Sequence, residues 1–391
     1  MSSDAKVRLA ALGLRVPELL LPREDVDLSR FAVIACDQFS AEKDYWERVR
    51  THVGDAPSAL NLILPEAWLR DGEAHRAAIV PTMERYLEDG VLRSVGEGMV
   101  FLKRETASGV RRGLVVAFDL EQYDYREGSR TLLRPTEATV ESRLPARVEI
   151  RREAPLELPH VLVLFNDPTD ALMGTMEGLT AQRSPLYDFE LMERGGHLTG
   201  WHVNEELDYV NLSGQLERLL DEANHGMLYA MGDGNHSFAA AKLHWEQIKA
   251  TLPEEQWEGH PARYALCELV NLYDKALPFE PIHRLVMGAD GATLCRELGL
   301  DPASPPPLQE LQPRLDEWLQ RHPEAELEYI HGADKCRELG EAPDSLAIVW
   351  ESFDREGLFP WVAAHGPLCR KSFSLGHAEE KRYYLEARRI R

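Results

Sequence analysis

A short segment of the sequence, Gly232-Asp-Gly-Asn-His-Ser237, combines glycines with side chains that can exchange protons or form hydrogen bonds. The apolar run Met227 to Met231 before it predicts a buried strand, and residues Phe238 to Leu252 after it predict a helix. A strand that turns into a helix leaves the first N–H groups of the helix unpaired, at the positive end of the helix dipole. Such a turn binds anions, and phosphate above all.

The side chains of this turn could add a proton acceptor to the anion site. Asp233 and His236 are its ionisable residues, and we expect both to be catalytic. We expect Gly234, Asn235 and Ser237 to bind phosphate or substrate. The alternative is a structural role, in which Asp233 or Asn235 caps the helix and the glycines supply positive-φ geometry.

Other ligand-binding motifs are absent from the sequence. The turn resembles a dinucleotide fingerprint, but its third small residue is Ser237 and no ribose-binding acid follows a strand about 20 residues later. No P-loop, H-E-x-x-H, H-x-H or C-x-x-C pattern occurs. We therefore expect no NAD, flavin or zinc site, and the motifs leave any other metal unknown.

Arginines concentrate between residues 126 and 152, where the sequence has seven arginines and four glutamates. An arginine beside a glutamate can hold phosphate or carboxylate through two hydrogen bonds while the acid orients it. We expect Arg134, Thr139 and Arg143 to bind phosphate or substrate, and Glu137 to be catalytic. A solvated face or structural ion pairs are the alternative for the other arginines of this segment.

Two more positions carry polar groups next to predicted strands. His283 and Arg284 follow the turn Phe279-Glu-Pro-Ile282 and precede an apolar run, which makes them candidate phosphate contacts or a surface pair with Glu280. Asp37 follows the apolar run from Phe31 to Cys36 and stands before a predicted helix. We expect Asp37 to bind substrate.

The elements that must position these residues alternate between helical and strand patterns, which predicts an α+β (mixed α/β) fold. Tyr45, Trp46, Val49 and Val53 share one side of a predicted helix. The remaining predicted elements are helices at 73–88, 212–223 and 308–320, a hairpin formed by 99–104 and 113–120, and strands at 160–165, 327–330, 346–350 and 359–363.

The order of these elements predicts three regions: an N-terminal α+β region (1–120), a core (121–290) with the arginine-rich segment and the glycine turn, and a C-terminal α+β region (291–391). The proline cluster at 302–307 is the best candidate for a linker.

Composition limits the partners. The 391 residues include 66 acidic and 44 basic side chains, a formal charge of −22, which argues against nucleic acid and anionic membranes as partners. Neither a signal peptide nor an apolar run of about 18 residues is present, so a cytoplasmic location is expected. Five widely spaced cysteines argue against a disulfide framework. A small anionic or hydroxylated metabolite fits this charge best, and a homodimer stays open.

The motifs in combination resemble a known family. The segments Cys36-Asp-Gln-Phe39, Arg134-Pro-Thr-Glu137-x-Thr139, Asp233-Gly-Asn-His236 and Pro281-Ile-His-Arg284 follow the order of the domain-of-unknown-function 1015 (DUF1015) family. The resemblance covers roughly residues 31–287. The glycine turn is also similar to the Asp-Gly-His-His-Arg signature of free-serine kinases with a ParB/sulfiredoxin-like fold, with Asn235 and Ser237 replacing a histidine and the arginine.

This resemblance implies a ParB/sulfiredoxin-like core and nucleotide-dependent phosphorylation of a small hydroxyl compound such as serine, with ATP or ADP and Mg²⁺. In that role Asp233 or Glu137 would accept the hydroxyl proton, and His236 with the helix N-terminus would hold the phosphate. Because Ser237 replaces the signature arginine, phosphate binding would shift to Arg134, Arg143 or Arg284, or nucleotide would not bind. A non-catalytic metabolite sensor and a metal-dependent phosphatase or hydrolase, with Asp37 and Asp233 as metal ligands or acid and base, are the alternatives.

Overall fold

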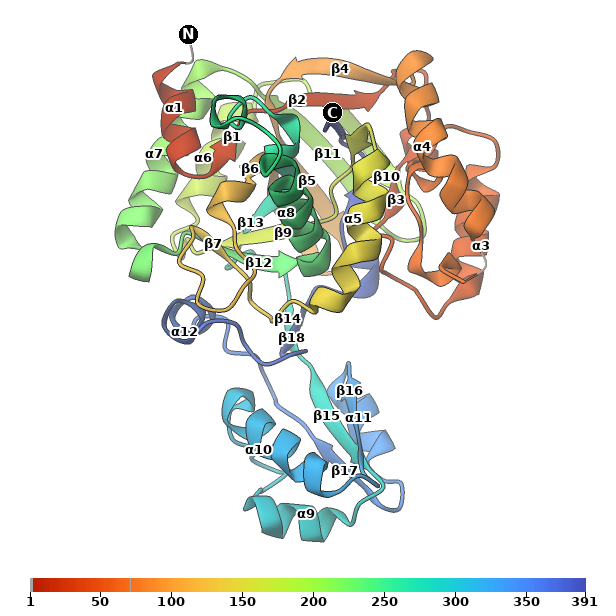
Figure 1. The fold of residues 1–391 in the computed structure, drawn as a ribbon, viewed down its shortest axis with the longest axis vertical. Coiled ribbons are helices and arrows are strands. Elements are labelled where there is room, and N and C mark those ends of the chain that lie inside the picture. The colour runs from red at the N-terminus through yellow and green to blue at the C-terminus, as the bar shows by residue number, and fades with distance from the viewer. Residues whose placement is uncertain (1–2, 71) are drawn as a thin grey trace. The chain divides into compact units, whose positions relative to one another are not determined.

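The chain forms a mixed α/β structure, which confirms the predicted fold class (Figure 1). The computed structural model describes residues 3–70 and 72–391, with the backbone alone for Arg143, Ala146 and Asn224. The residues divide into two compact units. The first comprises residues up to Pro135, Thr139–Leu277 and His377–Arg391, and the second comprises Thr136–Ala138 and Pro278–Gly376.

The two units differ from the three regions expected from the sequence. The hairpin of the expected N-terminal region, β5 (Met99–Thr106) and β6 (Gly109–Asp119), pairs through β6 with β13 (Tyr264–Asn271) of the expected core. Pairing between strands far apart in the sequence leaves no local signal, so the boundary at residue 120 falls inside one compact unit.

A mixed sheet forms the centre of the first unit, with strand order β10-β11-β5-β6-β13-β9-β12-β7 and with β1 paired to β6. Smaller pairs join β2 to β4, β3 to β19, and β8 to β20. The further strands are β1 (Leu14–Arg15), β2 (Glu18–Pro22), β3 (Val33–Ile34), β4 (Leu92–Glu97), β7 (Leu133–Arg134), β8 (Leu156–Glu157), β9 (Leu162–Phe165), β10 (Tyr187–Leu191), β11 (Gly196–Val203), β12 (Tyr229–Asp233), β19 (Tyr383–Tyr384) and β20 (Arg388–Arg389).

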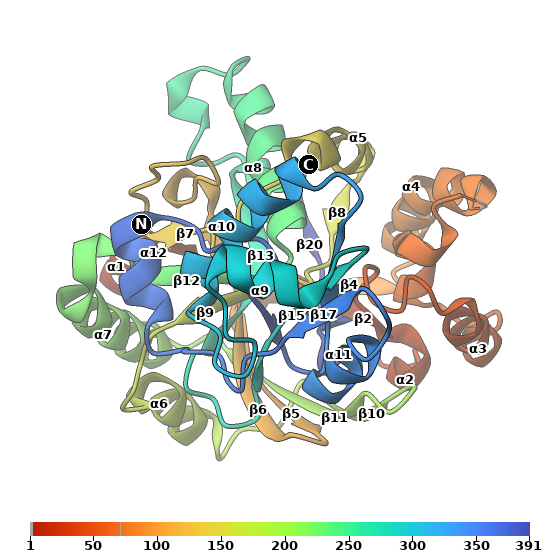
Figure 2. The ribbon, with the colours of Figure 1, turned by 90° about the horizontal axis from the view of Figure 1, so that it is seen from below.

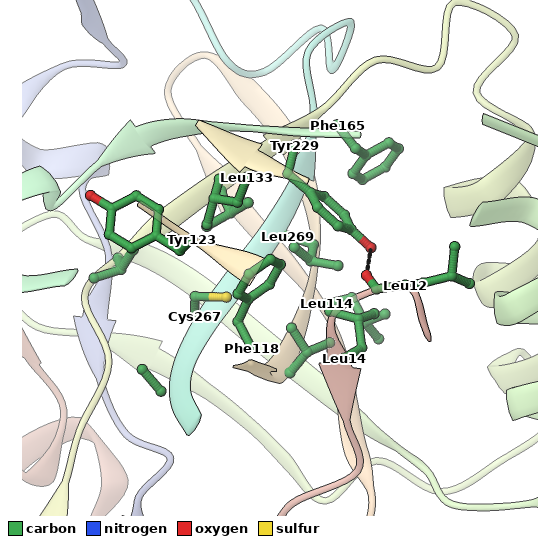
Figure 3. Packing of buried hydrophobic residues seen from close by; sticks show 14 of the residues in the cluster. Leu12, Leu14, Leu114, Phe118, Tyr123, Leu133, Phe165, Tyr229, Cys267 and Leu269 are labelled. Atoms are coloured by element: carbon green, nitrogen blue, oxygen red, sulfur yellow. Dashed lines mark hydrogen bonds between the residues drawn. The ribbon is translucent and has the colours of Figure 1, made fainter. Parts of the chain in front are cut away.

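Both faces of this sheet are buried. Along β6, Leu114, Val116 and Phe118 join the core on one face, and Val115 and Ala117 join the core on the other. This alternation is the two-residue period of a strand. Figure 3 shows the first of these cores, where the phenol of Tyr229 donates to the carbonyl of Leu12 at 3.1 Å.

Helices cover each face of the sheet. The cores contain side chains from α1, α5, α6, α7 and α8 on one face and from α3 and α4 on the other. The predicted helix at 73–88 is confirmed residue for residue, with Pro81 inside it. The helices of the unit are α1 (Asp4–Ala11), α2 (Leu28–Phe31), α3 (Lys43–Val53), α4 (Glu73–Glu88), α5 (Leu144–Glu153), α6 (Ala171–Thr180), α7 (Glu206–Glu222) and α8 (Asn235–Lys249). Among the described residues, no helix has the length and apolar character of a membrane span.

The second unit has a core of its own around a small sheet of order β16-β15-β17 and a separate pair, β14 with β18. Val286, Leu311, Leu315 and Trp318 lie in this core. The elements are β14 (Phe279–Pro281), β15 (His283–Met287), α9 (Gly291–Leu298), α10 (Leu308–Arg321), β16 (Glu326–Ile330), α11 (Ala333–Leu339), β17 (Ser345–Ile348), α12 (Leu358–His365) and β18 (Phe373–Leu375), several of which are labelled in Figure 2.

Two expectations for this unit are wrong. Residues 359–363 were expected as a strand but lie in α12, where Pro360 occupies the first helical turn and needs no N–H partner. A short apolar run does not distinguish a strand from a buried helix. The proline cluster at 302–307 lies inside the unit, between α9 and α10, and the carbonyl of Pro306 accepts a hydrogen bond from Trp350 Nε1 at 2.9 Å.

Candidate functional site

The glycine turn of the first unit joins β12 directly to α8, as the sequence predicts, although both elements begin and end a few residues away from the expected positions. Gly234 is the residue before the helix and has φ of 81°. A Cβ atom there would lie 2.9 Å from Val161 Cγ2 and 3.1 Å from Val161 Cα. Glycine is therefore required at this position, both for the positive φ and for the close approach of the turn to Val161.

The residue that precedes α8, Gly234, has no side chain with which to cap the helix. Asn235, His236 and Ser237 form the first helical turn, whose N–H groups have no partner within the helix. Asp233 was considered as a cap of the helix, but its side chain accepts the N–H of Gly234, the residue before the helix. This hydrogen bond to Oδ1, at 2.8 Å, fixes the turn.

The second oxygen of the Asp233 carboxylate, Oδ2, accepts a hydrogen bond from Lys381 Nζ at 3.0 Å. Burial opposes the ionisation of Asp233, but the positive charge of Lys381 and its hydrogen bond outweigh burial and lower the pKa of the carboxyl group. Both side chains are more than two-thirds buried. The end of β12 thus carries an ionised carboxylate that orients an ammonium group beside the N-terminus of α8.

Two buried arginines hold the segment that carries Lys381. Arg104 on β5 donates to the carbonyls of Glu379, at 2.6 Å, Glu380, at 3.1 Å, and Lys381. Arg111 on β6 donates to the carbonyl of Glu380 at 2.9 Å. The central hairpin of the sheet therefore fixes the backbone from which Lys381 extends.

His160 lies at the same end of the sheet as Asp233. In the antiparallel pair of β9 and β12, Leu162 is opposite Asp233, and Val161 contacts the turn at Gly234. Nδ1 of His160 lies 2.9 Å from the phenolic oxygen of Tyr384. When its ring is protonated, His160 also helps to lower the pKa of Asp233.

Tyr384 connects His160 to the segment around Asp37. Its phenol donates to Cys36 Sγ at 3.1 Å and accepts the N–H of Cys36 at 3.3 Å. Burial raises the pKa of the Cys36 thiol to about 12, so the thiol stays protonated near neutral pH. The carboxylate of Asp37 is half-buried and accepts a hydrogen bond from Gln38 Nε2 at 3.1 Å.

The arginine-rich segment is linked to the turn through His236. Nε2 of His236 accepts the N–H of Val140 at 3.3 Å. The helix that follows, α5, packs against α8, and Figures 1 and 2 show the two side by side. The side chain of Arg143 lies outside the described residues, so its predicted role stays a prediction.

The other members of this segment in the first unit have structural contacts. Arg134 is buried and donates to the carbonyls of Thr131, at 3.1 Å, and His225, at 2.6 Å. The hydroxyl of Thr139 is buried and has no hydrogen-bond partner among the described residues. Arg134 thus orders the loops on either side of it, and the expected role of both residues in binding phosphate stays a prediction.

Three expected site residues belong to the second unit. Glu137 accepts the N–H of Ser372 at 3.2 Å, and His283 Nδ1 accepts the N–H of Trp350 at 3.4 Å. Burial lowers the pKa of His283. Arg284 is buried and donates to Gln312 Oε1 and to the carbonyls of Ile282, Arg370 and Lys371, at 2.6–3.0 Å. These contacts stabilise the second unit.

Sequence reasoning missed Lys381, Tyr384 and the role of His160. His160 was visible as the first residue of a predicted strand, and its proximity to Asp233 follows only from the pairing of β9 with β12. Lys381 stands 148 residues after Asp233, and the sequence between them gives no sign that they pair. The one available signal was that a carboxylate buried at a strand end needs a counter-ion.

Mg²⁺ was expected from the resemblance. In the described part of the chain, no group of three or more His, Cys, Asp or Glu side chains is arranged to hold a metal ion. The acid that lies at the turn, Asp233, is already paired with Lys381. The donor set of the turn therefore does not fit a protein-bound metal.

Comparison with known proteins gives a family and no established function. A model of the family described as "Protein of unknown function (DUF1015)" matches residues 19–303. No curated protein matches significantly. Among solved structures, a conserved hypothetical protein from Pyrococcus furiosus is 13% identical with a TM-score of 0.33, covering 67% of this chain and 90% of its own. A point mutant of a free serine kinase, in complexes with AMP and with ADP, is 12% identical with a TM-score of 0.37, covering 69% of this chain and 90% of its own.

Proposed function

The chain belongs to the DUF1015 family, and from this premise we propose that it is a phosphotransferase that moves a phosphoryl group from a nucleotide to a small hydroxyl compound such as serine. One observation carries the proposal: the ion pair of Asp233 and Lys381 lies at the uncapped N-terminus of α8. A lysine and the first N–H groups of a helix are both well-established protein ligands of a phosphate group.

The proposed division of labour follows from the contacts. Lys381 and the first turn of α8 bind the phosphate that is transferred, and they neutralise the charge that develops on its oxygens. Asp233 was expected to accept the hydroxyl proton, but its lowered pKa makes it a weak base. Its carboxylate is better suited to hold Lys381 in position. His236 ties the turn to Val140 and closes the site on that side.

The negative charge of the whole chain fits a small ligand. A formal charge of −22 opposes large polyanions at long range. A partly buried lysine beside a helix N-terminus still attracts one phosphate group at short range, where the surrounding charges are screened. Mg²⁺ would arrive with the nucleotide as its counter-ion, since the proposal requires no metal bound by the protein.

A transfer assay tests this function. Purified protein is incubated with ATP or ADP, Mg²⁺ and L-serine, and formation of the phosphorylated product is followed by ³¹P NMR. We expect product with the wild type, and a loss of about 100-fold or more in Asp233→Ala, because Lys381 then loses the group that orients it. Asp221→Ala, which changes an exposed aspartate on α7, is the matched control.

The same experiment separates the alternatives. Nucleotide binding without product would favour a metabolite sensor. Metal-dependent release of phosphate from phosphoserine would favour a phosphatase. No product with either donor, or unchanged turnover in Asp233→Ala, would contradict the phosphotransferase.

A further inference from the structure

We propose that His160, through its Nε2 atom, is the proton acceptor of the transfer reaction, and that Tyr384 positions it. This inference rests on the proposed function. The juxtaposition that carries it is the end of the sheet where β9 begins and β12 ends, with His160 next to the glycine turn.

The hydrogen bonds of the Tyr384 phenol determine which nitrogen of His160 is available. The phenolic oxygen has two lone pairs and one proton. The N–H of Cys36 occupies one lone pair at 3.3 Å, and the proton is donated to Cys36 Sγ at 3.1 Å. His160 Nδ1, at 2.9 Å, then meets the remaining lone pair, and in this arrangement it carries a proton that it donates to the phenol. A neutral ring protonated on Nδ1 has a free lone pair on Nε2.

In the part of the chain that the structure describes, Nε2 of His160 has no hydrogen-bond partner. The ring is half-buried, so it is neither sealed in the core nor exposed at the surface. An imidazole held by one nitrogen with the other nitrogen free is the arrangement of a general base.

The ionisable groups next to His160 have separate roles. Asp233, at the neighbouring strand end, is ionised and interacts with His160. When Nε2 takes up a proton, the imidazolium donates from Nδ1 to Tyr384 and gains attraction to Asp233. Asp233 is committed to Lys381 through Oδ2 and to Gly234 through Oδ1, so the two ionisable groups have distinct roles.

The proposed step is balanced as follows. The hydroxyl oxygen of the acceptor forms a bond to the terminal phosphorus of the nucleotide, and the bond from that phosphorus to the bridging oxygen breaks. The hydroxyl proton moves to His160 Nε2, and the bridging oxygen leaves with its electron pair on the shortened nucleotide. Release of the proton to solvent restores the neutral ring.

Nitrogen-15 NMR of the full chain labelled at histidine tests the arrangement without any activity assay. The resonances of His160 are assigned by their loss in His160→Gln. We expect a neutral ring with the proton on Nδ1 in the wild type, and a loss of that preference in Tyr384→Phe. A ring protonated on Nε2 in the wild type would overturn the inference.

Turnover in the assay described above provides the second readout. We expect His160→Gln to lower kcat by about 100-fold or more with an unchanged Kd for the nucleotide, because a positioned base contributes about 10²–10⁴-fold. Tyr384→Phe should lower kcat less, and His52→Gln, which changes an exposed histidine on α3, should have no effect. Full turnover in His160→Gln beside an active wild type would overturn this inference alone. An inactive wild type would overturn the proposed function, and with it this role.

Discussion

At the scale of single residues, Asp233 holds the site together, because one carboxylate fixes both the glycine turn and the ammonium group of Lys381. One side chain thus makes both a local contact, with Gly234, and a contact with Lys381, which lies far along the chain. Its sequence position at a strand end was predictable from the pattern before Gly234. Its partner was not, because an ion pair between distant residues leaves no local pattern.

The ion pair gives the stability a defined pH dependence. Since the pKa of Asp233 is lowered in the folded chain, its contribution is present above the pKa of the unfolded chain, near 4, and is lost as the pH falls through the folded pKa. We expect the difference in free energy of unfolding between wild type and Asp233→Asn to be largest near pH 6–7 and to shrink below pH 4. Urea unfolding of both proteins across this range measures it, and a difference independent of pH would contradict the assignment.

Gly234 allows a test of the turn itself. Gly234→Ala should destabilise the chain by about 1–3 kcal/mol, because it adds left-handed strain and a contact of 2.9 Å with Val161. Gly226→Ala is the matched control, since Gly226 also has positive φ, at 65°, but its Cβ would meet nothing within 4 Å. Equal losses in the two variants, measured by urea unfolding, would show that the close approach is unimportant.

At the scale of elements, the central hairpin of the sheet positions the site from a distance. The guanidinium groups of Arg104 and Arg111 hold the backbone at 379–381 and therefore place Lys381. The hairpin was predicted from two runs that flank a Ser-Gly turn, and the strand–turn–helix of β12 and α8 from an apolar run followed by the glycine turn. Hydrophobic periodicity, glycines and prolines are local signals, and they sufficed for these elements and for α4.

Local signals failed where an apolar run was too short to show a period, or where a strand pairs with a segment far away in the sequence. The run at 359–363 is too short to show a helical period, so it was expected as a strand, but it lies in the helix α12. The short strands β19 and β20 were not predicted, because they form by pairing with β3 and β8, far earlier in the chain. One of the missed site residues, Tyr384, lies in β19, and another, Lys381, stands two residues before this strand.

Removal of the hairpin's hold on the C-terminal segment should be costly. Arg104→Met removes the donor from the carbonyls of Gly195, Glu379 and Lys381, whereas the carbonyl of Glu380 keeps its hydrogen bond from Arg111. Each buried carbonyl left unpaired costs about 1–3 kcal/mol. We expect a loss of at least about 2 kcal/mol in urea unfolding. Arg48→Met, which removes an exposed arginine paired with Glu193, should cost less than about 1 kcal/mol. Equal losses of stability in the two variants would contradict the role of Arg104 in holding residues 379–381.

At the scale of the whole molecule, the first unit is discontinuous in sequence. Its last segment, residues 377–391, follows the second unit along the chain. This segment contributes β19, β20 and two buried ion pairs, Arg382 with Glu268 and Arg388 with Glu157, the latter at 2.8 Å. Removal of one partner of a buried pair leaves an uncompensated charge.

We therefore expect a chain that lacks residues 377–391 to lose the cooperative thermal transition of the first unit. Both buried ion pairs would be lost together, and Glu268 and Glu157 would each keep one arginine, Arg111 at 3.3 Å and Arg151 at 2.6 Å. Differential scanning calorimetry measures the transition. A synthetic peptide of residues 377–391 added in trans should restore part of it, whereas a truncated chain with the wild-type Tm would contradict the proposed architecture.

The central claim is that Lys381 and the N-terminus of α8 form a phosphate site, and calorimetric titration with ADP and Mg²⁺ tests it most directly. Lys381→Met should weaken binding by about 10-fold or more, because a hydrogen bond to a charged group contributes about 1.5–3 kcal/mol. Lys249→Met, at the other end of α8, removes a lysine that is likewise partly buried and paired, with Glu121 at 2.5 Å, and should bind ADP as the wild type does. Equal affinity of wild type and Lys381→Met, or no binding by the wild type, would contradict the account.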